Sequence, residues 1–402
     1  MRKILFAICM STAFTACNKE DAPQKPEGLV DRTVLIYMAG ENNLTNWDNT
    51  NTPKGQYISR DIDEIKIGAR SIGNNNLLVY VDKADSIPPY LLYFWQNELR
   101  DSIPMEESKT SDPAVLEKIA RKAFTDYPAN SYGLVLWGHA NGWIIKNDSV
   151  EYTSMARRKA YGGDNGNNST SGSGKTWMNL PSMARALSHL PHLDFIFADC
   201  CQMMCVECAY ELKDVTDYYI ASPAEIPAQG APYNTIVPAM MEKTTYWTSM
   251  VDKYFAQTTE DLGNRVPLAV IKTSEMDNLA NATRTILQSI PAEKGIAPFP
   301  NLNGIIYYYS YNYFDMNDFL LKYAPEAEYN SWKKVFDDAV VYSKMATKWD
   351  TSKVWFDDFD MNEKTFGGVT MFIPRYNLQW SDNLTIRQMK WYYAAGYSDI
   401  GW

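Results

Sequence analysis

Histidine is scarce in this chain of 402 residues, which has only His139, His189 and His192. Any mechanism that needs an imidazole base therefore has three candidates. Basic residues are also outnumbered, 38 against 48 acidic ones, and the formal net charge of −10 argues against binding nucleic acid through its phosphates. Beyond the N-terminus, no stretch is long and apolar enough to cross a bilayer. The 12 Trp, 27 Tyr and 15 Phe exclude a disordered chain.

The first 16 residues have the pattern of an export signal. Arg2 and Lys3 precede an apolar run from Ile4 to Ala16 that is too short to span a membrane. The small residues before Cys17 resemble a bacterial lipoprotein signal, in which the cysteine becomes the lipidated first residue. The alternative is a simple secretory signal with an incidental cysteine. We expect a signal peptide over 1–16, a tether over 17–30, and a lipid anchor that holds the protein in the cell envelope, at the outer membrane, with surface exposure left open.

Cysteine is sparse outside one short segment. Four of the six cysteines lie within residues 199–208, whereas a disulfide framework spreads its cysteines over distant segments. The spacing of Cys201, Cys205 and Cys208 predicts one face of a helix, with Cys205 and Cys208 as small core residues. A zinc site with His189 and His192 is the alternative, but adjacent Cys200 and Cys201 do not have the usual ligand spacing.

Continuous apolar runs predict strands that are buried on both faces, at 33–39, 76–81, 91–95, 133–137, 193–198 and 217–222. Helical segments alternate with these runs, including one that begins at Asp112-Pro113. This alternation predicts an α/β fold with a mostly parallel central sheet. No linker interrupts the chain after residue 30. We therefore expect a catalytic domain over 31–240 and a C-terminal subdomain over 241–402 that packs on it.

Two reactive side chains are predicted to lie beyond strand ends. His139 follows the run 133–137 by two residues, and the pair Cys200 and Cys201 follows the run 193–198. In parallel α/β sheets, ligands bind beyond the carboxyl ends of the strands. A thiol nucleophile needs a nearby base such as imidazole. On spacing alone, His139 is equally consistent with a turn histidine bonded to the backbone.

These segments resemble the caspase-like cysteine peptidases, and more specifically the clostripain family. The resemblance rests on the order strand–His–small residue and then strand–Asp–small residue–Cys, in GLVLWGHANGW and DFIFADCCQMMCVECAYEL. Weaker similarities, such as TVLIYMAGENNL and GGVTMFIP, extend it over roughly residues 32–375. The resemblance implies a caspase-like three-layer fold with a mostly parallel central sheet and a C-terminal α/β extension packed on it.

The resemblance also assigns roles. It implies that His139 is the catalytic base, that Cys201 is the nucleophile, and that Cys200 takes the place of a small residue. Asp199 matches an acid that lines the pocket for Arg or Lys before the scissile bond, although a strand-end cap is an alternative role. The backbone N–H groups of Ala140 and Cys201 match the oxyanion hole, and here the family usually has glycine in place of Ala140.

The family is commonly matured by cleavage between the His and the Cys. A polar loop over 154–176 contains the consecutive cations Arg157, Arg158 and Lys159, which are candidate sites of self-cleavage; a solvated basic loop is the alternative. The chemistry requires no cofactor and we assign no metal ligand. Family members can depend on calcium, and the loop 163–168 is rich in oxygen, but its own sequence lacks the acidic ligand set of a defined site.

The first functional hypothesis is thus an anchored cysteine endopeptidase that cleaves protein or peptide substrates after Arg or Lys. The second is a catalytically inactive surface lipoprotein that binds protein or glycan through exposed aromatics, for which the candidates are Tyr307, Tyr308, Tyr309, Tyr311 and Tyr313.

Overall fold

The computed structural model describes residues 28–46, 55–145, 161–166, 168–257, 265–290, 302, 304–308, 313–349, 361–374 and 385–402. The predicted signal peptide with Cys17, most of the tether, and the basic run Arg157, Arg158 and Lys159 lie outside these residues. None of the helices in the described ranges combines the length and the apolar character needed to cross a membrane.

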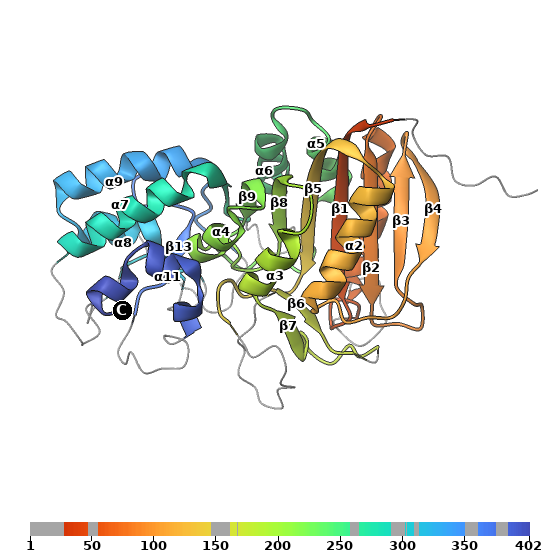
Figure 1. Cartoon of the computed structure of the whole chain (residues 1–402), viewed down its shortest axis with the longest axis horizontal. Helices are drawn as coiled ribbons and strands as arrows, with labels where there is room; N and C mark the ends of the chain where they lie inside the picture. The colour runs from red at the N-terminus through yellow and green to blue at the C-terminus, as the bar shows by residue number, and fades with distance from the viewer. Residues whose placement is uncertain are drawn as a thin grey trace, which may run out of the picture.

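A nine-stranded mixed sheet forms the centre of the molecule (Figure 1). Its order is β12 (Val340–Lys344), β10 (Leu268–Lys272), β9 (Thr216–Ala221), β8 (Leu193–Asp199), β5 (Ala129–Gly138), β1 (Val30–Gly40), β2 (Asn76–Lys83), β3 (Tyr90–Trp95) and β4 (Glu98–Pro104). The central run from β9 to β2 is parallel, and the strands at both edges are antiparallel. The predicted, mostly parallel sheet is confirmed.

Helices cover both faces of this sheet. α1 (Tyr57–Gly68), α5 (Tyr233–Met240) and α6 (Tyr246–Ala256) pack on one face, and α2 (Pro113–Asp126), α3 (Leu180–Leu187) and α4 (Val206–Leu212) on the other (Figure 1). Side chains of β1 alternate between the two cores, Ile36 facing α1 and Tyr37 facing α2. As predicted, Asp112 caps α2, since its carboxylate accepts from the Ala114 N–H at 2.9 Å.

The second half of the chain completes the sheet and adds a helical layer. β10 and β12 extend the central sheet, while α7 (Met276–Ser289), α8 (Met316–Tyr323), α9 (Glu326–Ala339), α11 (Lys390–Ala394) and the small pair β11 (Phe314–Asp315) and β13 (Thr370–Met371) lie beside it (Figure 1). Glu207 in α4 ties the two parts together, because its carboxylate accepts from the Phe372 N–H at 2.7 Å. The predicted division at residue 240 stays a prediction.

Candidate active site

The ends of β5 and β8 place His139 and Cys201 at the same level of the sheet. The two strands are parallel neighbours, and Trp137 pairs with Asp199 in their register. His139 and Cys201 each lie two residues beyond this pair. Since adjacent strands are about 4.8 Å apart, the register brings the two turns together at the carboxyl edge of the sheet, where α/β folds bind ligands.

The turn after His139 packs directly against the turn after Cys201. Gly142 has a φ of +61°, and a Cβ at this position would lie 2.6 Å from Cys205 Sγ and 2.7 Å from the Gln202 carbonyl oxygen. Glycine is therefore required both by the backbone conformation and by the close approach. Tyr313 anchors the same turn from the C-terminal part, its hydroxyl donating to Asn141 Oδ1 at 2.9 Å.

The two adjacent cysteines have different surroundings. Cys200 is fully buried, its thiol donates to the Leu136 carbonyl at 3.0 Å, and burial raises the pKa of this thiol well above its usual value. Cys201 is only partly buried, and its sulfur accepts from the Ile226 N–H at 3.5 Å. A partly exposed thiol whose sulfur accepts a hydrogen bond is better suited to be a nucleophile than a fully buried one.

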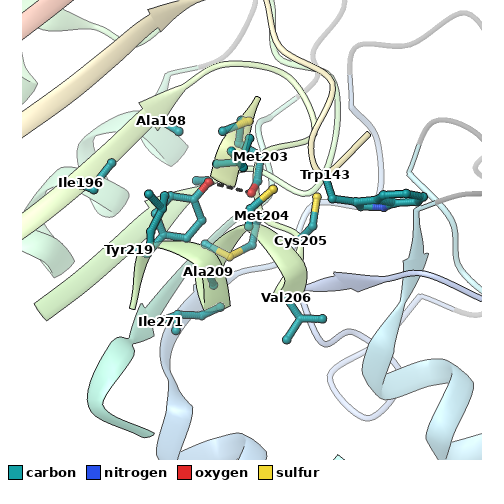
Figure 2. Close-up of a cluster of buried hydrophobic side chains, with 14 of the residues drawn as sticks. Trp143, Ile196, Ala198, Met203, Met204, Cys205, Val206, Ala209, Tyr219 and Ile271 are labelled. Atoms are coloured by element: carbon teal, nitrogen blue, oxygen red, sulfur yellow. Dashed lines mark hydrogen bonds between the residues drawn. The ribbon is translucent and has the colours of Figure 1, made fainter. Parts of the chain in front are cut away.

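Core packing anchors the turn that carries Cys201. Met203 and Met204 point into a buried cluster with Ile196 and Tyr219, and the Tyr219 hydroxyl donates to the Met203 carbonyl at 2.8 Å (Figure 2). These buried contacts hold the turn that carries Cys201 in place.

The predicted cysteine face of one helix is wrong. α4 begins only at Val206, with Cys205 as its N-cap, so Cys201 lies in a turn before the helix. Cys205 and Cys208 are nevertheless buried core residues, as predicted. The zinc alternative has no support, because exposed His189 contacts Glu117 and exposed His192 contacts Asp217 instead of the cysteines.

A contact that the sequence analysis missed fixes the ring of His139. His139 Nε2 lies 2.7 Å from Asn43 Oδ1. An amide oxygen only accepts, so Nε2 carries the proton and Nδ1 is the basic nitrogen. The Asn43 N–H donates to the Gly172 carbonyl at 2.9 Å, and the Trp177 ring lies 6.5 Å from the imidazole between centroids. The only sequence signal was the position of Asn43 in the family-like segment after β1.

Asp199 is the last residue of β8; it is buried and lies two residues before Cys201 in the sequence. Its carboxylate accepts from the hydroxyls of Tyr233 at 2.9 Å and Tyr254 at 3.0 Å and from the Ala231 N–H at 3.0 Å. Burial raises its pKa, and these hydrogen bonds act in the opposite direction.

A second carboxylate, Asp61 of α1, approaches Asp199 and was not identified from the sequence. Asp61 Oδ2 accepts from Trp137 Nε1 at 2.6 Å. Burial, and next the charge of Asp199, raise the pKa of Asp61 well above its usual value. Both carboxylates face Gly230, where a Cβ would lie 2.9 Å from Asp199 Oδ2 and 3.0 Å from Asp61 Oδ2. The carboxylates of Asp199 and Asp61 therefore lie close to each other beside Gly230.

Alanine in place of the family's glycine after His139 causes no backbone strain. Among the described residues, those with a side chain and a positive φ are Gln96, Asn97, Asn168 and Gln202, so Ala140 has an ordinary conformation. Ala140 forms an isolated bridge with Tyr161, and the Gly162 N–H donates to the His139 carbonyl at 2.9 Å.

Comparisons with known proteins identify the family and the fold of this chain. The model of the clostripain family matches residues 36–385. A secreted C11 cysteine protease from Bacteroides thetaiotaomicron, solved in complex with an irreversible peptide inhibitor, is 29% identical with a TM-score of 0.73, over 92% of this chain and 100% of that chain. An inactive zymogen C11 protease from Parabacteroides distasonis is 27% identical with a TM-score of 0.71, over 92% and 99% of the two chains. No curated relative matches the chain.

The family match spans most of the chain, and each of the two solved proteases aligns with 92% of it. The caspase-like fold expected from the resemblance is confirmed. The chain belongs to the clostripain family of cysteine peptidases.

Proposed function

We propose that this cysteine peptidase works through a dyad of His139 and Cys201. The observation that carries the proposal is the strand register, which sets both residues two positions beyond the paired Trp137 and Asp199. The partial exposure of Cys201 and the buried state of Cys200 support the choice of nucleophile.

The reaction follows from the positions of these groups. His139 Nδ1 takes the proton of the Cys201 thiol, and the thiolate attacks the peptide carbonyl. The N–H groups of Ala140 and Cys201 stabilise the resulting oxyanion. The amine leaves with the proton from His139 to give a thioester, which water then hydrolyses with His139 again as the base.

Arginine, or lysine, is the proposed residue before the scissile bond. Asp199 lies two residues from the nucleophile, and Asp61 adds a second buried carboxylate at the same point. Two acids that face each other in a low-dielectric site favour a cation between them. A guanidinium satisfies both carboxylates more fully than an ammonium.

Matched fluorogenic peptides test this function. The purified protein is expected to hydrolyse a peptide with Arg before the reporter group, to cleave the Lys analogue more slowly and the Ala analogue least, and to lose all of this activity after treatment with iodoacetamide. Hydrolysis that iodoacetamide does not affect contradicts the thiol mechanism. Equal rates on the three peptides contradict the proposed specificity.

Asn43 is proposed as a positioning residue for His139. Asn43→Ala removes the acceptor that holds Nε2 at 2.7 Å, and kcat is expected to fall roughly 10- to 100-fold, with a smaller change in KM, because the imidazole loses its orientation. Asn43→Asp keeps an acceptor but adds a negative charge, which stabilises the imidazolium. The pH profile of kcat is then expected to shift to higher pH. Unchanged kcat and pH profile in both variants contradict this role.

Self-cleavage after Arg157, Arg158 or Lys159 is proposed as the activating step. Lys159 is two residues before Tyr161, which bridges to Ala140 beside the catalytic histidine. A relative solved as an inactive zymogen supports activation by cleavage in this family.

The active protein is expected to consist of two chains, and Cys201→Ala protein purified alone is expected to remain one. N-terminal sequencing of the second fragment locates the cut. A fully active, intact chain contradicts the activation step. A nicked Cys201→Ala protein shows that another protease makes the cut.

We further propose that Cys17 carries a lipid that anchors the mature protein in the cell envelope, at the outer membrane. A relative described as secreted supports export of this family. The alternative of a binding platform made of aromatics is weaker, because Tyr308 and Tyr313 are fully buried, whereas Tyr309 and Tyr311 lie outside the described residues.

A further inference from the structure

Two buried cysteines lie at the start of α4, directly after the turn that carries Cys201. They belong to a C-x-x-C sequence, with Cys205 as the N-cap of α4 and Cys208 three residues later. Both residues are 0% exposed, and both are free thiols in this structure. Side chains at the N-cap and three positions later lie next to each other at the start of a helix. The fold therefore brings together two thiols that the proposed peptide hydrolysis does not use.

The side chains of these two cysteines are in contact. The Cys208 thiol forms a hydrogen bond with the Cys205 side chain, and burial, together with this bond, raises the pKa of Cys208 well above its usual value. The adjacent pair Cys200 and Cys201 differs, because its two sulfurs contact backbone groups of two different segments. Cysteines at C-x-x-C spacing form disulfides in redox-active proteins. The contact therefore favours a bond between Cys205 and Cys208.

The Cys205 sulfur also contacts both turns of the proposed dyad. Its thiol donates to the Gln202 carbonyl at 2.9 Å, and Gln202 is the residue after Cys201. The same sulfur packs against the turn after His139, because a Cβ on Gly142 would lie 2.6 Å from it. A change in the bonding of Cys205 is therefore transmitted to both turns.

Gln202 depends on its hydrogen bond with Cys205. The φ of Gln202 is +53°, a left-handed conformation that is strained for a residue with a side chain, so surrounding contacts must hold it. One contact is the Cys205 thiol, and the other is the Ala224 carbonyl, which accepts from the Gln202 N–H at 2.9 Å. A disulfide has no S–H group, so its formation leaves the Gln202 carbonyl without the thiol donor. The position of Cys201 is then less well fixed.

We propose that Cys205 and Cys208 are a modification site, at which oxidation to a disulfide lowers the activity of the peptidase. The two thiols lose two protons and two electrons, and the disulfide of a small thiol or of a thiol oxidoreductase accepts the electrons and becomes two thiols. The thiolate of one cysteine first displaces one thiol from the oxidant, and the other cysteine then displaces the second thiol.

The surroundings of the pair determine when this exchange takes place. Both cysteines are buried in the folded chain, so the exchange takes place while the chain folds or opens locally. The proposed export puts the folding chain in a compartment where disulfides persist. The effect on activity rests on the proposed dyad, whereas formation of the disulfide does not.

The full chain with Cys200→Ala and Cys201→Ala tests the disulfide independently of activity. The reduced, unfolded protein is refolded in oxidised glutathione, and folded protein is equilibrated with the same oxidant in parallel. Free thiols are then alkylated, and trypsin releases the peptide 186–213, in which Cys205 and Cys208 are the remaining cysteines.

This peptide is expected to escape alkylation and to be two hydrogens lighter than its reduced form, and dithiothreitol is expected to restore both thiols. The proposal is overturned if the peptide is fully alkylated in both samples, or if it carries glutathione adducts in place of the internal disulfide.

Activity is compared between the wild type and Cys208→Ala, the matched control that keeps the Cys205 thiol. Both are oxidised in the same way and then treated briefly with reduced glutathione, which frees partly exposed Cys201 but not a buried disulfide. The kcat of the wild type is expected to stay roughly 3- to 30-fold low until dithiothreitol is added, because Cys201 is displaced. Cys208→Ala is expected to recover fully in the brief treatment. Full recovery of both proteins contradicts the effect on activity, whereas a reduced wild type that cleaves no peptide contradicts the proposed dyad instead.

Cys205→Ala tests the cause of the lower activity. This variant lacks the thiol donor to the Gln202 carbonyl in every redox state. Its kcat is therefore expected to be low without oxidant, by about the same factor as in the oxidised wild type, and to be unaffected by oxidation of the remaining thiols once Cys201 is freed. A full kcat in Cys205→Ala protein that is folded by circular dichroism overturns the proposed effect on activity.

Discussion

Replacing Cys201 with alanine is expected to abolish peptide hydrolysis. In the proposed mechanism the Cys201 thiolate forms the acyl-enzyme, and loss of a catalytic nucleophile typically reduces kcat by ~10⁴-fold or more. The variant is expected to fold normally, because Cys201 is only partly buried and the turn is held in place by the buried side chains of Met203 and Met204. The measurement is the hydrolysis rate of an Arg peptide by the mature, two-chain form; the variant chain is nicked beforehand by active wild-type enzyme, which iodoacetamide then inactivates.

Cys200→Ala is the matched control one residue away. Its thiol is buried and donates to the Leu136 carbonyl, so its removal is expected to cost some stability and to leave most of kcat. Mass spectrometry after alkylation gives an independent answer, because an active-site-directed alkylator should label Cys201. Labelling of Cys200 with Cys201 untouched would overturn the assignment.

Asp199→Asn is expected to lower kcat/KM for Arg peptides by about 10- to 150-fold, which corresponds to roughly 1.5–3 kcal/mol for a charged hydrogen bond. Peptides with a neutral residue at the same position should lose much less, because they do not use the charge. The readout is therefore the ratio of the two kcat/KM values, which a general loss of folded protein leaves unchanged.

Tyr254→Phe tests whether the preference for Arg depends on the charge of Asp199 or on the hydrogen bonds that surround its carboxylate. This variant removes the hydroxyl that donates to Asp199 Oδ1 at 3.0 Å but keeps the carboxylate, so the preference for Arg should persist. Equal losses on Arg and neutral peptides in Asp199→Asn would make Asp199 a structural strand-end residue, the other role that the sequence allows.

The central strands were predictable because burial on both faces leaves a continuous apolar run in the sequence. The runs 133–137 and 193–198 correspond to β5 and β8, with bounds that differ by a few residues. Periodicity was misleading for the cysteines, because residues at helical spacing need not share a helix. The chain needs a tight turn at Gln202, whose φ is +53°, before α4 begins.

The sequence identified the candidate site residues that lie just beyond the ends of β5 and β8. It did not identify the residues that other elements bring into the site. Asn43 and Asp61 precede His139 and Cys201 by roughly 80–160 positions and reach the site through β1 and α1. Such contacts depend on sheet order, which local patterns do not encode.

The strand order has a consequence for a chain cut between residues 146 and 160. Every strand on one side of the β5–β8 boundary precedes the cut, and every strand on the other side follows it. The boundary between the two fragments therefore lies in the middle of the sheet, between β5 and β8. The fragments are held together by the hydrogen bonds between these two strands and by the packing of α1 on α5 and of α2 on α3. After the proposed cut, each fragment would carry one residue of the proposed dyad. The cleaved peptidase would then be a heterodimer of its own halves, and separating the fragments would take His139 and Cys201 apart without breaking another covalent bond.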